Sequence, residues 1–399
     1  MPGTRLLILH AGAVLMLLLA AARESAAVPG CPFCAPSDPP YSERLARCDV
    51  ALEVTWVSLK SDEEKGSEST TFEVVNAFRT TKLKFKEKDQ VTWGYGRNGK
   101  PGDRFLLIGV EDQDTVNWEQ PVSLGGEYLY AYIRKVPPPE APDRLAFFLK
   151  FLEFPDDEIC SDAYAEFSRA QYKDVAALAP KLPRAKLRTW IASEEPRIQV
   201  RLGLYGMMLG LGGDDTDAQF LEQQIMKRPE PDKPRFGIDG MMAGYILLQG
   251  ERGLQKLVDA KFADPNGEDD LLALRNALMF LWDYGQDRVP AESLRAAMRR
   301  FLERPTLAVN VIENLARWKD WTSLDPLIAA YGKAPFDSSL SRQKVVAFAL
   351  VCEKDGKKTS PDALPASAIK SRQFLDGLDR DFVKSVERFL SPQTTEKTP

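Results

Sequence analysis

Two cysteines in a C-x-x-C spacing, Cys31 and Cys34, stand just after an apolar leader. A thiol pair at this spacing can exchange disulfides, hold a metal ion or close a structural disulfide. Redox pairs of this type follow a strand and open a helix, whose N-terminus favours the thiolate. Here the pair precedes every strand-like segment, and Pro36, Pro39 and Pro40 disfavour an immediate helix. A structural disulfide is the favoured interpretation, and redox chemistry is the alternative.

The other cysteines, Cys48, Cys160 and Cys352, are widely scattered. A four-thiolate metal site would need two of them to converge on the C-x-x-C pair. We therefore predict no metal and no cofactor. Five cysteines leave at least one thiol unpaired, and Cys352 is a candidate for a buried thiol within a helix. Cys48 remains, with Cys31 and Cys34, a disulfide or thiol candidate. Lipidation at Cys31 is disfavoured because the preceding VPG does not resemble a lipobox.

The single histidine of the chain, His10, lies in the leader. A mature chain without the leader therefore contains no imidazole. Ser-His-Asp and Cys-His catalysis, histidine-ligated zinc and C-x-x-C-H haem attachment all require one and are excluded. Carboxylate, lysine, tyrosine and cysteine chemistry remain, and no convincing catalytic constellation of these residues is present.

Two carboxylates, Asp162 and Glu166, lie one helical turn apart in DAYAEFSRAQY. Such a pair can perform acid–base chemistry on a sugar. The apolar stripe of this segment runs along another face, so we expect both carboxylates to be solvated. Glu166 is then spaced to pair with Arg169.

Two acidic turns, residues 154–162 and 212–217, contain carboxylates that could bind calcium. Neither has the alternating ligand order of a calcium loop. Each directly precedes a helical pattern, where aspartate is favoured as the N-cap. We predict capping rather than metal binding.

Two tryptophans end the segment ENLARWKDW. Trp318 shares a helical face with Leu307, Val311 and Leu315, which predicts a core position. Trp321 lies just beyond, near a turn. It is the candidate for contact with a stacked carbohydrate or aromatic ligand.

The elements around these residues begin with residues 1–27, which have the pattern of a signal peptide. Arg5 precedes an apolar stretch, and small residues end at Ala27, the predicted cleavage site. The apolar stretch is about as long as a minimal membrane span, so an uncleaved anchor is the alternative. We expect an exported protein, periplasmic or extracellular. Removal of the leader changes the formal charge from −5 to −6, which argues against nucleic acid as a partner.

Residues 28–136 are predicted to form a small antiparallel β-barrel domain. Period-2 patterns rich in Val, Thr and aromatic residues indicate five or six strands, at residues 49–58, 70–78, 82–85 with 89–96, 102–110 and 127–135. A short helix capped by Asp38 should precede them. This number of short strands fits a closed barrel of the OB type.

The Pro-rich residues 137–142 are predicted to act as a stiff linker. Apolar residues at spacings of three and four then predict about a dozen helices in residues 143–390. Residues 197–229 show the order of a HEAT-like repeat, two helices around an acidic turn, and looser versions follow. Residues 391–399 are polar and are predicted to form a disordered tail. The fold class is thus α+β: a small barrel followed by a solenoid-like helical array.

The first of these regions resembles the netrin-like, metalloproteinase-inhibitor type of OB barrel. The resemblance rests on Cys31-x-x-Cys34, on Cys48-Asp49-Val50-Ala51-Leu52, and on the segments FEVVNAF and GDRFLLI. It implies a barrel and a terminal segment able to contact a protease. The chain has no cysteine between Cys48 and Cys160, so the barrel disulfides of that family cannot form.

The mature chain as a whole resembles an uncharacterised family of exported proteins from planctomycete-type bacteria. The matching segments are CPFC, RLAFFLKFLE, DAYAEFSRAQY, LYGMMLGLGG, GYILLQGERGL and ENLARWKDW. This resemblance implies envelope localisation and an architecture, and no activity.

The sequence therefore predicts an exported binding or scaffold protein whose helical array contacts protein partners in the cell envelope. The alternatives are a thiol-disulfide or metal-handling protein that uses CPFC, and a protease inhibitor-like N-terminal domain. Neither nucleic acid nor stable membrane insertion after signal removal is expected.

Overall fold

The computed structural model describes residues 30–35, 37–62, 64, 66–125, 127–227, 235–264, 267–360 and 362–390. The predicted signal peptide, its cleavage site at Ala27 and the predicted tail at 391–399 lie outside these residues. No helix within the described ranges has the length and apolar character needed to cross a bilayer.

The N-terminal region contains one antiparallel sheet in the order β3-β2-β1-β4-β5, with β6 paired to β4. The strands are β1 (Val50–Asp62), β2 (Ser67–Arg79), β3 (Gln90–Trp93), β4 (Arg104–Asp112), β5 (Thr115–Trp118) and β6 (Val122–Ser123). No pairing among the described residues joins β3 to β5, so the sheet is a curled half-barrel. Closure into an OB barrel stays a prediction.

The alternation along the two central strands explains how this sheet is buried. In β1, Val50 and Leu52 pack in a small core within the sheet, whereas Ala51 between them belongs to the main core. In β4, Phe105 likewise packs in the small core and Leu106 in the main core. Because successive side chains point to opposite faces, both faces of β1 and β4 are covered. The second face packs against helices and ties the sheet to the rest of the chain.

Helices make up most of the remaining chain. They are α1 (Tyr41–Arg47), α2 (Glu127–Ile133), α3 (Arg144–Phe148), α4 (Asp157–Arg169), α5 (Tyr172–Ala176), α6 (Arg184–Ile191), α7 (Pro196–Gln199), α8 (Leu202–Gly212), α9 (Asp215–Met226), α10 (Ile238–Ala263), α11 (Glu268–Tyr284), α12 (Ala291–Arg299), α13 (Pro305–Arg317), α14 (Leu324–Ala330), α15 (Ser339–Thr359), α16 (Ala366–Asp376) and α17 (Arg380–Leu390). Short 3-10 turns lie at Leu149–Phe151, Ala179–Lys181, Arg300–Glu303 and Trp321–Ser323. The predicted α+β layout is confirmed.

Two predicted strands and one predicted helix cap are wrong. Residues 127–135, predicted as a strand, form α2, because Leu129, Tyr132 and Ile133 are buried at helical spacing. Residues 82–85 are not a strand, and β5 and β6 lie between the predicted strands. The first helix begins at Tyr41 after Pro40, without a side-chain cap from Asp38.

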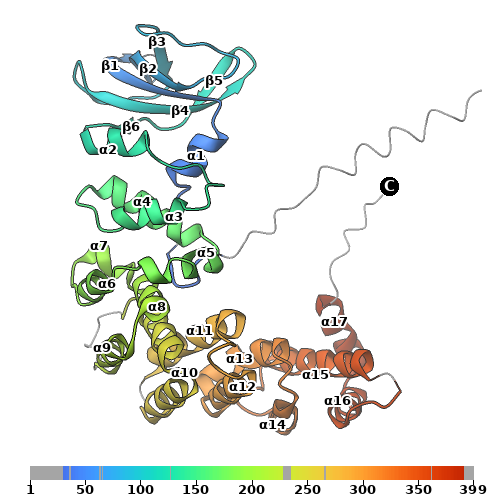
Figure 1. Cartoon of the computed structure of the whole chain (residues 1–399). Coiled ribbons are helices and arrows are strands. Elements are labelled where there is room, and N and C mark those ends of the chain that lie inside the picture. Colours follow the sequence, from blue (N-terminus) through green and yellow to red (C-terminus); the bar gives the residue numbers. More distant parts are fainter. Residues whose placement is uncertain are drawn as a thin grey trace, which may run out of the picture.

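The helices form two arms (Figure 1). The sheet stands at one end, α1 to α7 follow beneath it, α8 to α10 form a corner, and α11 to α17 lead away from that corner. The main hydrophobic core contains residues from both sides of residues 137–142, among them Leu106 of β4 and Phe148 of α3. The Pro-rich stretch therefore connects elements that share a core.

The corner depends on close contact between α8 and α10. Both begin with the same pattern, G-x-x-G-M-M-x-G, at residues 203–210 and 237–244. A Cβ on Gly206 would lie 2.6 Å from the backbone nitrogen of Met241. A Cβ on Gly244 would overlap the carbonyl oxygen of Gly206. Only glycine allows the two backbones to approach this closely.

The long helix α10 changes direction at Gly250, whose φ of 62° and ψ of −146° are not helical. The positive φ is readily adopted by glycine. Gly250 thus divides α10 into two helical halves. Where two helices around an acidic turn were predicted in residues 197–229, the structure has α7, α8 and α9.

Candidate functional site

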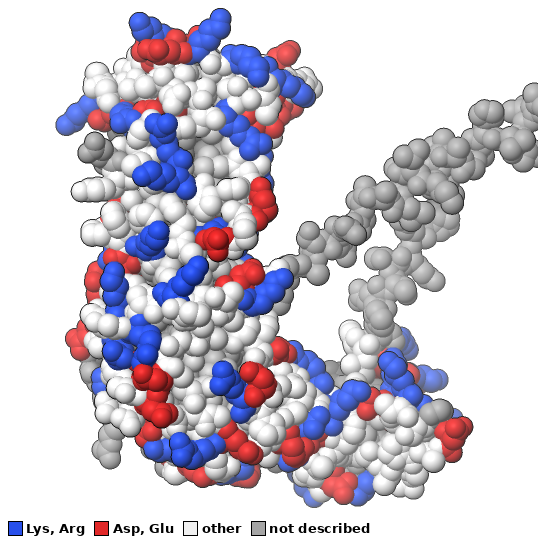
Figure 2. All heavy atoms as spheres, viewed as in Figure 1, with Lys and Arg blue, Asp and Glu red and all other residues white. Residues whose placement is uncertain are grey.

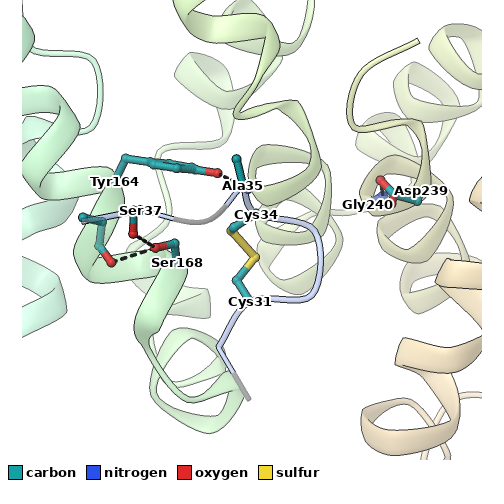
Figure 3. The surroundings of a disulfide bond; sticks show 9 residues. Cys31, Cys34, Ala35, Ser37, Tyr164, Ser168, Asp239 and Gly240 are labelled. Atoms are coloured by element: carbon teal, nitrogen blue, oxygen red, sulfur yellow. Dashed lines mark hydrogen bonds between the residues drawn. A yellow bond between two sulfur atoms is a disulfide. The ribbon is translucent and has the colours of Figure 1, made fainter. Parts of the chain in front are cut away.

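The C-x-x-C segment lies among the helices, away from the sheet. Cys31 and Cys34 are joined by a disulfide, and both residues are half-buried. Figure 3 shows the segment running beside α4, which carries Tyr164 and Ser168. The segment was predicted to belong to the barrel domain of residues 28–136. The segment instead packs between helices that lie far apart in the sequence.

Hydrogen bonds fasten the segment to α4 on both sides of the disulfide. The backbone N–H of Cys31 donates to the carbonyl oxygen of Ser168 at 2.8 Å. The backbone N–H of Ala35 donates to the hydroxyl of Tyr164 at 3.0 Å. The hydroxyls of Ser37 and Ser168 are 2.6 Å apart (Figure 3). The chain is therefore held at both ends of the four-residue loop.

Phe33, inside the disulfide loop, is the apolar anchor of the segment. Its side chain is buried, and its ring centroid lies 4.9 Å from that of Phe280 in α11. On α8, a Cβ at Gly203 would lie 2.6 Å from the carbonyl oxygen of Phe33. The loop thus contacts α4, α8 and α11 together. This arrangement is that of a structural clip at the corner of the two arms.

The three remaining cysteines are free thiols, and all are buried. The thiol of Cys48 donates to the carbonyl oxygen of Leu45 at 3.3 Å, so it takes no part in the C-x-x-C site. Burial raises the pKa of the Cys48 and Cys352 thiols and thereby disfavours reactive thiolates. No cluster of candidate metal ligands occurs in the part of the chain that the structure describes.

Replacing both Cys31 and Cys34 by serine should lower the free energy of unfolding by about 2 kcal/mol, the loop-closure value for so short a loop. Urea unfolding without reductant measures the difference, and wild-type protein with reductant should match the variant. Equal stability of variant and oxidised wild type would contradict a structural clip. Reduction of insulin by the wild type, lost in the variant, would establish the redox alternative instead.

The paired carboxylates of α4 are buried, so the prediction of a solvated face is wrong. Asp162 and Glu166 are 7% and 1% exposed. Asp162 accepts hydrogen bonds of 2.6 Å from the backbone N–H of Tyr41 and from the hydroxyl of Tyr132. Helices α1, α2 and α3 enclose this polar face of α4, because Tyr41 and Tyr132 bind Asp162 and Arg144 pairs with Glu166.

The predicted ion pair of this helix is also wrong. Glu166 pairs with Arg144 of α3, whereas Arg169 pairs with Glu43 of α1 at 2.8 Å. Each partner lies on a neighbouring helix. The charged groups of α4 thus connect it to α1 and α3, and their positions depend on packing that the helical spacing does not reveal.

Burial raises the pKa of both carboxyl groups of α4 above the ordinary values. It raises the pKa of Asp162 to about 6, against the opposing effect of the hydrogen bonds from Tyr132 and Tyr41. It raises the pKa of Glu166 to about 7 despite the nearby Arg144. Burial also raises the pKa of Tyr41 and Tyr132, so both hydroxyls remain neutral donors. Both oxygens of Asp162 are occupied by protein donors, which is the arrangement of a crosslink between helices.

The acidic turns cap helices, as predicted. Asp156 accepts from the backbone N–H groups of Glu158 and Ile159, each at 3.1 Å, at the start of α4. Asp214 starts α9 in a reciprocal capping box with Asp217. These bonds satisfy amides that a helix leaves free at its N-terminus.

The tryptophans differ in their surroundings. Trp318 is fully buried and stacks on Trp282 with ring centroids 4.5 Å apart, which confirms the predicted core position. Trp321 is half-buried and donates from its indole N–H to Asp355 at 3.1 Å. Its ring packs edge-on against Phe348. These contacts belong to the interior of the array and lend no support to ligand stacking at Trp321, which stays a prediction.

A cavity of about 800 Å³ lies where the sheet meets the helices, and no pattern in the sequence predicts it. Its lining comes from the segment before α1, from α1, the loop after β3, the segment from β5 to β6, and the starts of α2 and α4. The charged residues among them are Asp38, Arg44, Arg97, Glu119, Asp156 and Glu158. Because these segments are far apart in the sequence, no spacing pattern could have found them.

No protein-family model matches this chain, and neither the curated proteins nor the solved structures contain a match. The resemblances to netrin-like barrels and to exported planctomycete-type proteins therefore stay predictions.

Proposed function

We propose that this chain is an exported binding or scaffold protein of the cell envelope whose helical array contacts protein partners. The observation that carries the proposal is the long second arm, α11 to α17, which leads away from the corner as successive helices (Figure 1). Arrays of this kind present extended surfaces that suit protein partners.

The surface of the arm supports a protein partner over a polyanion. On the face shown in Figure 2, Lys and Arg side chains are interspersed with Asp and Glu, without an extended area of one sign. Nucleic acid binding depends on clustered positive charge. Exposed apolar side chains on the array include Leu272 of α11, Leu340 of α15 and Ile369 of α16.

The two alternative functions receive less support from the geometry. A thiol-disulfide enzyme needs a reactive first cysteine, and a protease inhibitor needs an accessible terminal segment. Here Phe33 is buried between helices, and hydrogen bonds hold Cys31 and Ala35 to α4. These contacts favour a structural use of the segment.

A photo-crosslinking amino acid at Leu272, Leu340 or Ile369 should give a discrete crosslinked product in the envelope fraction. The same amino acid at Val75 or Val110, exposed apolar positions of the sheet, is the matched control and should give none. Export predicts in addition that the recovered chain begins at Val28. Products from the sheet positions alone, or from neither set, would contradict partner binding by the array.

A further inference from the structure

We propose that the cavity between the sheet and the helices is a binding site for a short peptide with a free amino group and a free carboxylate. Its volume of about 800 Å³ lies within the range of known ligand sites, roughly 300–1,000 Å³. The site is separate from the array surface proposed above and does not depend on it.

One wall of the cavity supplies a positive charge. Arg97, in the loop between β3 and β4, lines the cavity, and its guanidinium carbon lies 5.5 Å from the centre of the Phe105 ring. Two hydrogen bonds hold the backbone of Arg97. Its N–H donates to the hydroxyl of Thr70, and its carbonyl oxygen accepts from the indole N–H of Trp56. Its side chain forms no ion pair within the described residues. A guanidinium held in this way can bind a carboxylate.

The helical wall supplies negative charge. Asp38, Asp156 and Glu158 line the cavity, and none of them forms an ion pair with Arg97 or Arg44. Glu158 is oriented by the hydroxyl of Tyr41, which donates to one of its oxygens at 2.7 Å. Asp156 is held by the amides that it caps. Both therefore keep a second oxygen that can accept from an ammonium group.

The second arginine of the cavity is already neutralised. Arg44 donates to Glu119 from two nitrogens, at 2.9 and 2.7 Å. Among the lining residues that the structure describes, this leaves one guanidinium without an ion pair, from the sheet side, and three carboxylates from the helix side. Pro121, Val122 and Leu129 provide apolar lining between polar groups. A ligand with an ammonium at one end, a carboxylate at the other and a partly apolar body matches this distribution, and a short peptide has all three.

Di-, tri- and tetra-alanine with free termini are the probes, tested by calorimetry on the chain without its leader. We expect saturable binding by at least one of them. Acetylating its amino group or amidating its carboxylate should each weaken binding about tenfold, the usual loss for one charge-assisted contact.

Two variants assign the ends of the peptide. Arg97→Ala should abolish the preference for a free carboxylate and keep the preference for a free amine. Glu158→Gln should do the reverse. Arg317→Ala, in an exposed ion pair on α13, is the matched control and should bind like the wild type. Circular dichroism checks that each variant is folded. Absence of saturable binding for the whole series, or binding that the terminal blocks and Arg97→Ala leave unchanged, would overturn the proposal.

Discussion

Replacing Gly244 by alanine should lower the free energy of unfolding by about 2 kcal/mol, the usual scale for overpacking a core. The new Cβ would overlap the carbonyl oxygen of Gly206, which is backbone and has no rotamer by which to move aside. Helices α8 and α10 would have to separate. By helix propensity alone, alanine is more favourable than glycine by about 1 kcal/mol. A net loss of stability in Gly244→Ala would therefore show that the steric overlap with Gly206 outweighs the gain in helix propensity.

Urea unfolding followed by circular dichroism measures this change. The matched control is Gly377→Ala, since Gly377 is exposed at the end of α16 with a φ of −81°. The nearest atom to its added Cβ is the carbonyl oxygen of Phe374 at 3.4 Å. This variant should be as stable as the wild type or slightly more so. Equal, unchanged stability of both variants would contradict a tight crossing of α8 and α10.

Much of the architecture was predictable because it depends on local periodicity. The alternating residues of β1 and β4 and the helical spacing after residue 143 each indicate their own element. Capping by Asp156 and Asp214 was predictable for the same reason, since a cap contacts only the next few residues. The repeated G-x-x-G-M-M-x-G pattern is also local, but its relation to the close crossing of α8 and α10 follows only from their packing.

Features that depend on distant neighbours were not predictable in this way. Residues 127–133 are rich in Tyr and alternate like a strand, yet packing of Leu129 and Tyr132 against the helices favours α2. The face of α4 with Asp162 and Glu166 is polar in sequence and buried in space. The hydrogen-bond donors to these carboxylates come from α1, α2 and α3, and the sequence of α4 alone does not predict them.

The same reason separates the two candidate sites. Cys31 and Cys34 were found because four residues contain the whole motif, although the helices that surround it were not. The cavity with Arg97 and Glu158 was missed because it exists only after the sheet and the helices have packed. A site built from single residues far apart in the chain has no motif that can be recognised in one sequence.

Asp162 should make the protein less stable as the pH rises from about 4 to about 6. Its pKa in the folded protein is raised from 3.8 to about 6, chiefly by burial. Between these values the folded state binds a proton that the unfolded state has released, so the free energy of unfolding falls as pH rises. A shift of about two pKa units corresponds to roughly 3 kcal/mol at most. Other carboxylates also titrate in this range, so the test compares a variant with the wild type at each pH.

Asp162→Asn imitates the protonated acid. Its carbonyl can still accept from the Tyr41 N–H, and its amide can donate to the Tyr132 hydroxyl in place of the present bond. We expect the variant to match the wild type near pH 4 and to exceed its stability at pH 8 by up to roughly 3 kcal/mol. Urea unfolding across this pH range measures the difference. Asp325→Asn, which removes an exposed carboxylate paired with Lys370, should leave the pH profile of the wild type unchanged. If Asp162→Asn is instead less stable than the wild type at pH 8, the ionised carboxylate is the form that holds α1, α2 and α4 together.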